Sequence, residues 1–449
     1  MKSSRPFRFV LAVLSAFTLS LAVCAQAQTF KTIFSFNGIN GRYPQTGLIF
    51  DSAGNLYGAA EDGGDPKTCT FYYGCGVVYR LSPTAGGTWQ DTTLFAFTTS
   101  NTGALPDSSL LLTSNGGLIG TVYNGGSSDH CGGAVAGCGL VYELSPALSG
   151  FWPETVLQYF DDFTDGGISA GGIIADSAGN LYGTTVVGGN TSGCGGNGCG
   201  TVFRLAPNGS GSWEETVLYT FTGASDGGSP GAALILDAAG NLYGTTVGGG
   251  NTAPGCATSD GSGCGVVFEL SPTESGSWSE SVLYRFTGGH DGAIPESSLV
   301  FDSAGNLYGT TYLGGFSNSN CIASQCGVVY KLSPNGSGGW RQTVVHEFKG
   351  STDGQNPVAN VILDSAGNLY GTAPFGGNVN LCSPYGGCGV AFKISPAAGG
   401  WSETPLHIFA DGNDGAFPYA PLTFDSSGNL YGATMSGSNE AGVVYKITP

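Results

Sequence analysis

The chain has 449 residues, of which only 10% are charged and 79 are glycine, and its formal net charge is −18. Such an acidic surface repels phosphate groups, so no nucleic acid or anionic lipid is expected as a partner. The many glycines suit short strands joined by tight turns. A disordered chain is not expected, because apolar positions recur regularly along the sequence.

Residues 1–27 have the pattern of a secretory signal peptide. Three basic residues precede an apolar run over 9–23, and small residues offer a cleavage site that ends at Ala27. No later segment is apolar for long enough to span a membrane. The mature protein is therefore predicted to be secreted or periplasmic, with 11 basic and 32 acidic residues and a formal charge of −21 (11 − 32).

The tetrapeptide Asn-Leu-Tyr-Gly recurs through the chain at nearly constant spacing. Its last glycines, with one degenerate copy at Gly120, are Gly58, Gly120, Gly183, Gly244, Gly309, Gly371 and Gly432. The intervals are 62, 63, 61, 65, 62 and 61 residues. One supersecondary unit is therefore repeated seven times, as in solenoids and propellers.

The fourth repeat shows how one unit divides into strands. Short runs rich in β-branched and aromatic residues cover 234–237, 242–246, 265–270 and 281–286, with Gly, Asn, Ser and Pro between them. This alternation predicts a four-stranded antiparallel blade, and no helical periodicity is sustained outside the signal.

The two ends of the mature chain are complementary. Residues 31–36 match a fourth strand, and residues 442–447 match a third strand that lacks its fourth. In a closed ring the N-terminal strand completes the last blade and covers its exposed edge. The sequence therefore predicts an all-β fold, a single domain over 28–449 that forms a seven-bladed β-propeller closed by its N-terminal strand.

Twelve cysteines remain after Cys24 leaves with the signal, and they fall into six pairs, one in each of the first six repeats. The pairs are Cys69/Cys75, Cys131/Cys138, Cys194/Cys199, Cys256/Cys264, Cys321/Cys326 and Cys382/Cys388. An even count in an exported chain predicts disulfides within each repeat. A metal site would need four converging ligands, whereas these pairs lie in separate repeats and no His recurs beside them.

The segments DSAGNLYGTT, GVVYKLSP and TVLYTF resemble the GloVer-type (Gloeo-Verruco) tandem repeats of secreted and surface-attached bacterial proteins. The resemblance extends over essentially the whole mature chain. It implies an exported repeat architecture, and it transfers no active site, because the family has no assigned catalytic residues.

In an up-and-down blade, the loop between strands two and three lies on the same face as the link to the next blade. This loop-rich face is the predicted recognition surface, whereas the opposite face carries short turns and six tryptophans that are expected to pack. Its predicted ligand-binding residues are Asp165, Asp226, Asp291, Asp353 and Asp414 of the Asp-Gly links, with His290 and Tyr72. The same aspartates could hold calcium or a polyhydroxylated or cationic ligand, but Asp-Gly is also a turn pair, and its repetition favours that structural role.

The sequence favours an exported binding or scaffold module for an extracellular glycan or protein, and it contains no recognisable catalytic motif. The alternative is a propeller-type polysaccharide lyase or glycoside hydrolase with its site on the loop-rich face. Glu61, Asp161 and Asp162 could then supply the paired carboxylates, and Glu296 is another residue that departs from its siblings. A monomer without a membrane span or cofactor is expected, and the sequence leaves open whether calcium binds.

Overall fold

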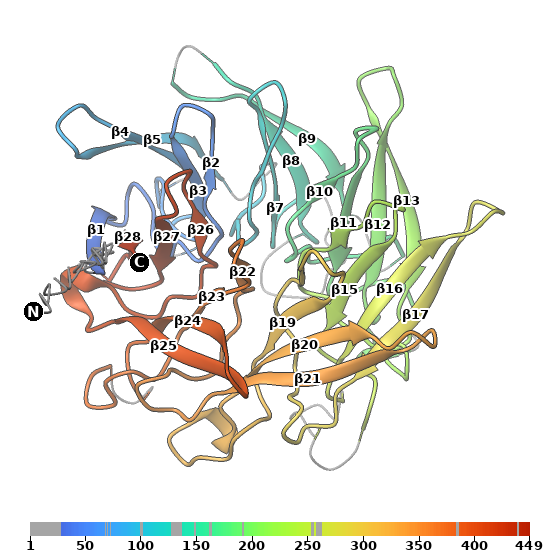
Figure 1. Ribbon diagram of the computed structural model, residues 1–449. Coiled ribbons are helices and arrows are strands. Elements are labelled where there is room, and N and C mark those ends of the chain that lie inside the picture. Colours follow the sequence, from blue (N-terminus) through green and yellow to red (C-terminus); the bar gives the residue numbers. More distant parts are fainter. Residues whose placement is uncertain are drawn as a thin grey trace, which may run out of the picture.

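The computed structural model describes residues 28–449 except 68, 70, 72, 99–101, 127–136, 148–149, 161–163, 191–192, 253–255, 257–262, 383–385 and 438–439. Seven four-stranded antiparallel sheets are arranged as blades around a common centre (Figure 1). The predicted all-β, seven-bladed propeller is confirmed. In the described part of the chain, no helix is long and apolar enough to cross a membrane.

Each blade runs outward from a short inner strand to a long outer strand. The innermost strands are β2 (Ile49–Phe50), β6 (Leu111–Leu112), β10 (Ile174–Ala175), β14 (Ile235–Leu236), β18 (Val300–Phe301), β22 (Ile362–Leu363) and β26 (Thr423–Phe424). The second strands are β3 (Leu56–Ala60), β7 (Leu118–Val122), β11 (Leu181–Thr185), β15 (Leu242–Thr246), β19 (Leu307–Thr311), β23 (Leu369–Ala373) and β27 (Leu430–Thr434).

The third strands are β4 (Val77–Pro83), β8 (Leu140–Leu144), β12 (Thr201–Pro207), β16 (Val266–Pro272), β20 (Val328–Pro334), β24 (Val390–Ala397) and β28 (Val443–Thr448). The outer strands are β5 (Trp89–Ala96), β9 (Glu154–Tyr159), β13 (Trp213–Thr220), β17 (Trp278–Arg285), β21 (Trp340–Glu347), β25 (Gly400–Ile408) and the N-terminal β1 (Thr29–Ser35). Short 3-10 turns occur at Cys194–Gly196, Ile322–Ser324 and Gly412–Asp414.

The strand boundaries differ from the expectation at the outer hairpin. In the fourth blade, β17 begins at Trp278, three residues before the expected 281, because Trp278 pairs with Pro272 at the end of the ladder. The tryptophan therefore belongs to the strand. Its ring packs on the preceding blade, with 6.3 Å between the ring centroids of Trp278 and Tyr182.

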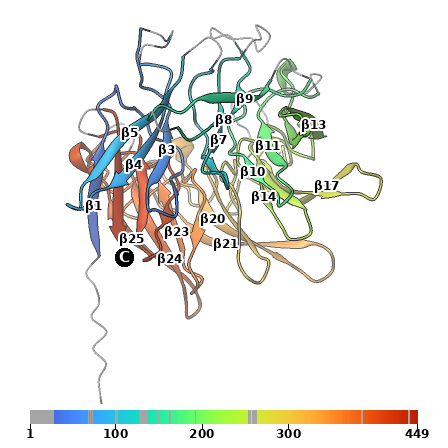
Figure 2. The same ribbon diagram turned by 90° about the horizontal axis from the view of Figure 1, so that it is seen from above.

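The N-terminal strand closes the ring. Strand β1 pairs antiparallel with β28, from Thr29 opposite Thr448 to Ser35 opposite Val443. The last sheet therefore has the order β1, β28, β27, β26, and its outermost position is filled from the other end of the chain. Strands β1 and β28 lie side by side in Figure 1, and Figure 2 shows β1 at the periphery of the molecule.

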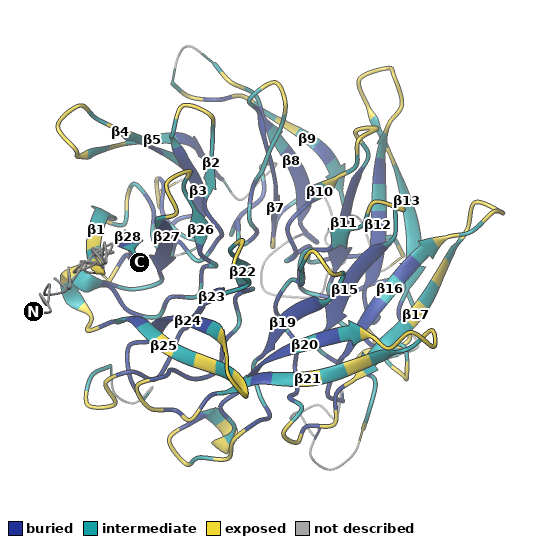
Figure 3. Ribbon diagram, viewed as in Figure 1, coloured by how far each residue is buried: buried dark blue, intermediate teal, exposed yellow. Residues whose placement is uncertain are grey.

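The hydrophobic core lies between neighbouring blades and not within any single one. One cluster joins Tyr182 and Phe221 of the third blade to Leu242 and Phe268 of the fourth. Figure 3 shows the buried second and third strands near the centre and the exposed hairpin turns at the periphery. A repeat unit buries its apolar surface against its neighbours, so each blade depends on the ring for stability.

The Asp-Ser-Ala-Gly-Asn turns between the first and second strands are held by their aspartates. In the turn between β2 and β3, Asp51 accepts hydrogen bonds from the backbone of Ala53 and Asn55 and from the side chains of Asn55 and Tyr57. Desolvation raises the pKa of Asp51, but these hydrogen bonds outweigh it and leave the pKa below its ordinary value.

Candidate functional site

The loop-rich face carries the disulfides. Five of the six predicted pairs form, each within its own repeat: Cys69–Cys75, Cys194–Cys199, Cys256–Cys264, Cys321–Cys326 and Cys382–Cys388. Several local disulfides in one chain are typical of an oxidising, extracytoplasmic compartment.

Cys138 is the one member of the sixth predicted cysteine pair that lies among the described residues. Its side chain is fully buried in the core between the second and third blades, and it is disulfide-bonded. Its predicted partner, Cys131, lies outside the described residues. The predicted bridge from Cys138 to Cys131 is therefore not confirmed as a pair, and it stays a prediction.

A cavity of about 430 Å³ lies at the centre of the ring on this face. Each blade contributes to its wall the residue that stands four positions before the innermost strand. These seven residues are Gln45, Asp107, Ala170, Gly231, Glu296, Val358 and Tyr419. A narrower space of about 130 Å³ lies between the same residues and the one or two lining residues that follow each of them. The backbone repeats sevenfold, whereas the side chains do not.

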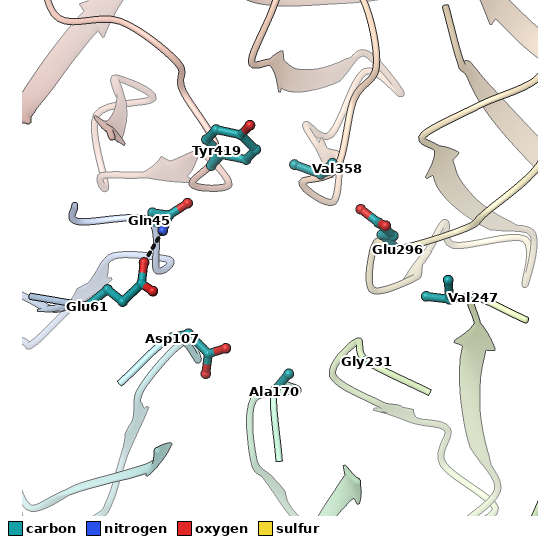
Figure 4. Close-up of a pocket in the computed structure, with 9 residues that line it drawn as sticks. All are labelled: Gln45, Glu61, Asp107, Ala170, Gly231, Val247, Glu296, Val358 and Tyr419. Atoms are coloured by element: carbon teal, nitrogen blue, oxygen red, sulfur yellow. Dashed lines mark hydrogen bonds between the residues drawn. The ribbon is translucent and has the colours of Figure 1, made fainter. Parts of the chain in front are cut away.

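Two further residues reach the cavity from the second strands. Glu61 follows the last residue of β3, and Val247 follows the last residue of β15. The end of a second strand and the start of an innermost strand share one face, because the two strands are antiparallel. In Figure 4, Gln45, Glu61 and Asp107 stand on one side of the cavity, and Glu296 stands on the other.

Three carboxyl groups face this cavity, and burial perturbs all of them. Desolvation, reinforced by the charge of Glu61, raises the pKa of Asp107 to about 8. Burial raises the pKa of Glu296 to about 7. The pKa of Glu61 is also raised, by desolvation and by the nearby Asp62, and a hydrogen bond from the Gln45 amide opposes this rise.

The arrangement can donate and accept hydrogen bonds from one small space. At neutral pH, Asp107 is mostly a neutral carboxylic acid, which donates through its hydroxyl, while the Gln45 amide is already bound to Glu61. Tyr419 adds an aromatic ring to the wall. Among the described residues, no group of three or more His, Cys, Asp or Glu side chains could hold a metal ion.

The predicted link aspartates are engaged in their own turns. Asp291 accepts hydrogen bonds from the Tyr284 hydroxyl at 2.9 Å and from the backbone N–H of Thr287 at 2.9 Å. Asp226 makes the equivalent contacts with Tyr219 and Thr222. This is the turn role that repetition of the Asp-Gly pair favours, and binding of an external ligand by these carboxylates stays a prediction.

Two blades replace that tyrosine by histidine. His407 contacts Asp414 at 2.8 Å between Nε2 and Oδ1, and Asp414 also accepts the backbone N–H of Ala410. His346 lies 3.3 Å from Asp353, measured between Nε2 and Oδ2. Desolvation raises the pKa of Asp353, but the contact with His346 and two backbone hydrogen bonds outweigh it, and the pKa falls below its ordinary value. These histidines take the structural place of tyrosine.

The remaining sequence-predicted residues are dispersed. His290 is 83% exposed and pairs with Glu347 at 3.1 Å rather than with the adjacent Asp291. Thr201 donates a hydrogen bond to the backbone carbonyl of Asp165. Outside the described residues lie Tyr72, Asp161 and Asp162.

The polar and aromatic cavity residues that the sequence reasoning missed are Gln45, Asp107 and Tyr419. Five other blades also have proline before the cavity residue, as in Pro295-Glu296, so alignment of the repeats on this proline would have shown that Asp107 departs from its siblings. Glu61 and Glu296 are recognisable in the sequence because they differ from the equivalent residues of the other repeats. The proximity of Glu61 to Asp107 is not, because the two residues are 46 positions apart in the chain. The carboxyl that accompanies Glu61 in the cavity is Asp107.

Comparison with known proteins supports the repeat assignment. The family model described as the Gloeobacter/Verrucomicrobia repeat matches residues 130–322 and 254–449. No curated protein matches the chain.

Two solved structures match parts of the chain at low similarity. One is a candidate gluconolactonase, 16% identical, which covers 66% of this chain and 74% of its own with a TM-score of 0.32. The other is a gluconolactonase of Xanthomonas campestris, 14% identical, which covers 74% of this chain and 82% of its own with a TM-score of 0.38. At these TM-scores the likeness supports no inference about activity.

Proposed function

Because the chain belongs to the Gloeobacter/Verrucomicrobia repeat family, which supplies a repeated scaffold and no active site, we propose that its function lies where the repeats differ. The protein is an exported binding propeller that takes a polyhydroxylated, glycan-type ligand at the central cavity of its loop-rich face. Its local disulfides and the signal-like residues 1–27 support export to the periplasm or the extracellular space.

One observation carries this proposal. The seven residues at the same backbone position around the cavity comprise an amide, two carboxyl groups, an aromatic ring and three small or apolar residues. A rigid scaffold with a few polar groups converging on a concave site is the usual form of a small-ligand site. Polar and aromatic groups of this kind are suited to the hydroxyls and apolar faces of a sugar.

The direct test is a glycan array probed with the mature protein, followed by calorimetric titration of any glycan that binds. Tyr419→Ala and Gln45→Ala should weaken binding by about tenfold or more, since each removes a direct contact worth about 1.4 kcal/mol. Ser303→Ala, in a turn on the opposite face, is the matched control and should bind normally. Equal losses from both faces would contradict the central cavity as the site.

A second function is favoured by the adjacent carboxyl groups of Asp107 and Glu61. Paired carboxyls with raised pKa values are the usual apparatus of general acid and base catalysis on glycosidic bonds. In this alternative Asp107 donates a proton and a second carboxylate accepts one, in a polysaccharide lyase or glycoside hydrolase. Release of reducing ends from a polysaccharide by the wild type, and not by Asp107→Asn, would replace the binding function by this one.

A further inference from the structure

We propose that the ligand of the central cavity carries a positive charge, and that the site selects an organic ammonium group such as the amine of an amino sugar. This inference rests on the proposed function and narrows its ligand class. It follows from the groups around Asp107, from the acidic character of the described cavity residues, and from the size of the space.

Asp107 lines the cavity and holds an unused acceptor in its wall. Its Oδ1 atom is buried and has no hydrogen-bond partner among the described residues. Figure 4 shows Asp107 at the cavity wall between Glu61 and Ala170. A buried carboxylate without a partner is costly, and the cost is relieved either by a proton or by a cation. In the free protein the raised pKa of Asp107 favours the proton.

None of the described residues that line the cavity is basic, although three carry carboxyl groups. The neighbouring Arg42 is occupied elsewhere: its guanidinium lies 3.8 Å from the ring centroid of Tyr73 and 3.7 Å from Glu440. Desolvation raises the pKa of Asp62, and the charge of Arg42 opposes this rise, whereas Arg42 is not among the groups that shift the pKa of Asp107. The cavity therefore has an excess of acidic groups that the described protein itself does not balance.

Aromatic rings accompany these carboxyls. Tyr419 lines the cavity. Desolvation raises the pKa of Tyr123, which is 37% exposed, and the nearby charges of Asp107 and Glu61 raise it further. Tyr312 stands in the same relation to Glu296. Carboxylates combined with aromatic faces are the recognition elements for ammonium groups, which gain from both charge and the ring quadrupole.

The size of the cavity favours an organic cation over a bare metal ion. Calcium needs six to eight oxygen ligands at about 2.4 Å. A space of about 430 Å³ separates Glu296 from Glu61 and Asp107, and no three His, Cys, Asp or Glu side chains of the described residues converge closely enough for a metal. A sugar-sized cation, in contrast, can reach more than one wall.

Binding of such a cation must displace protons. Asp107 faces Glu61, Tyr123 and the buried Tyr142, and Glu296 faces Tyr312, so no cation of the described residues competes for either carboxyl. With pKa values of about 8 for Asp107 and about 7 for Glu296, both groups are partly protonated in the free protein at pH 7. A bound ammonium group lowers both pKa values, and the released protons pass to the buffer.

The test compares ligands that differ in charge. Glucosamine oligosaccharides and their N-acetylated counterparts are titrated calorimetrically at pH 7.0 in two buffers of different ionisation enthalpy. The amine form should bind at least about tenfold more tightly, the effect of one charge-assisted hydrogen bond, and should release protons. Choline and its neutral isostere 3,3-dimethylbutan-1-ol form a second pair, in which the ligand charge does not vary with pH.

The outcomes separate this inference from the proposed function. If both sugars bind equally and without proton release, the charge selection is wrong and the glycan function stands. If choline binds and its isostere and both sugars do not, the cation site stands and the glycan function fails. Absence of binding by both charged probes overturns the inference, as does displacement of either one by millimolar calcium.

Variants locate the site. Asp107→Asn and Glu296→Gln keep the shape and remove the charges, so each should reduce the preference for the amine by about tenfold and reduce proton release. The matched control is Glu274→Gln, an exposed residue of the turn between β16 and β17, which should leave both quantities unchanged. Melting temperatures of all three variants establish that they fold. A folded Asp107→Asn variant with unchanged charge preference would contradict the assignment.

Discussion

The glycine of the repeated Asn-Leu-Tyr-Gly motif is explained by one aromatic ring on the adjacent strand. In the fifth blade, Gly309 is paired with Tyr330, and a Cβ atom added to Gly309 would lie 2.5 Å from the Tyr330 hydroxyl oxygen. Phe268 covers Gly244 in the same way in the fourth blade. The glycine is therefore required by close packing, and its backbone conformation is ordinary for a strand.

The hydroxyl of this ring contributes no visible hydrogen bond. Tyr330 is fully buried, and its hydroxyl oxygen has no partner among the described residues. We expect Tyr330→Phe to leave stability unchanged or raise it by up to about 1 kcal/mol, because an unpaired buried polar atom is removed. Gly309→Ala should cost about 1 to 3 kcal/mol through overpacking. Denaturant unfolding measures both, and a marked loss in Tyr330→Phe would show that the hydroxyl has a partner.

At the scale of the element, a polar residue of the outer strand can form a hydrogen bond with the loop that connects its blade to the preceding blade. In the fifth blade, Gln342 of β21 donates a hydrogen bond of 3.1 Å to the backbone carbonyl of Asp291. The matching position of β17 holds Glu280, which pairs with the buried Leu270 and has a buried, unpartnered Oε1 atom. Glutamate also occupies the position in other blades: Glu154, Glu215 and Glu403.

This substitution predicts a pH dependence of stability. Desolvation, aided by Asp226 and opposed by Arg285, raises the pKa of Glu280 to about 7. A carboxyl whose pKa is higher in the folded state stabilises the fold fully below its unfolded pKa, and this contribution is lost as pH rises through the folded value. Glu280→Gln should therefore be more stable than wild type at pH 8 and show no advantage at pH 4.5, where the wild-type carboxyl is protonated.

Thermal or denaturant unfolding at both pH values measures this effect. Gln342→Glu is the reciprocal variant and should be less stable than wild type at pH 8 and close to it at pH 4.5. A pH-independent difference in either variant would indicate a packing effect and would remove the electrostatic explanation.

Each described disulfide is a local feature of one loop. Cys256 and Cys264, eight residues apart, join the middle of the loop between β15 and β16 to its C-terminal end, and both are buried. The double variant Cys256→Ala/Cys264→Ala should lose about 2 kcal/mol, because the unfolded chain regains loop freedom. Denaturant unfolding of this variant gives the value, and wild type under reducing conditions should lose more, since every bridge opens. An unchanged free energy of unfolding would mean that this disulfide does not stabilise the fold by restricting the unfolded chain.

For the whole molecule, stability depends on closure. Phe36, just beyond β1, is 1% exposed, and the Phe30 ring stacks on His407 with 3.6 Å between centroids. Deletion of residues 28–37 removes these contacts and exposes the edge of β28, so we expect a much lower melting temperature and self-association through that edge. Thermal unfolding and sedimentation velocity measure the two effects. A synthetic peptide of residues 28–37 should reverse both, and normal melting of the truncated protein would contradict closure.

The repeats, the strands, the ring closure and five of the cysteine pairs could be predicted from sequence, because each depends on residues near one another in the chain or on a pattern repeated seven times. The partner of Cys138 stays a prediction, since Cys131 is not described. The start of β17 at Trp278 is less predictable, because a strand extends for as long as its backbone finds pairing residues on the neighbouring strand, here as far as Pro272.

Only the tertiary structure decided which residues share the central cavity. Asp107 and Glu296 belong to different repeats and are brought to one space by the ring. Their raised pKa values arise from the burial that the ring creates. The scaffold is encoded in what the repeats have in common, whereas the site is formed by single residues in which they differ.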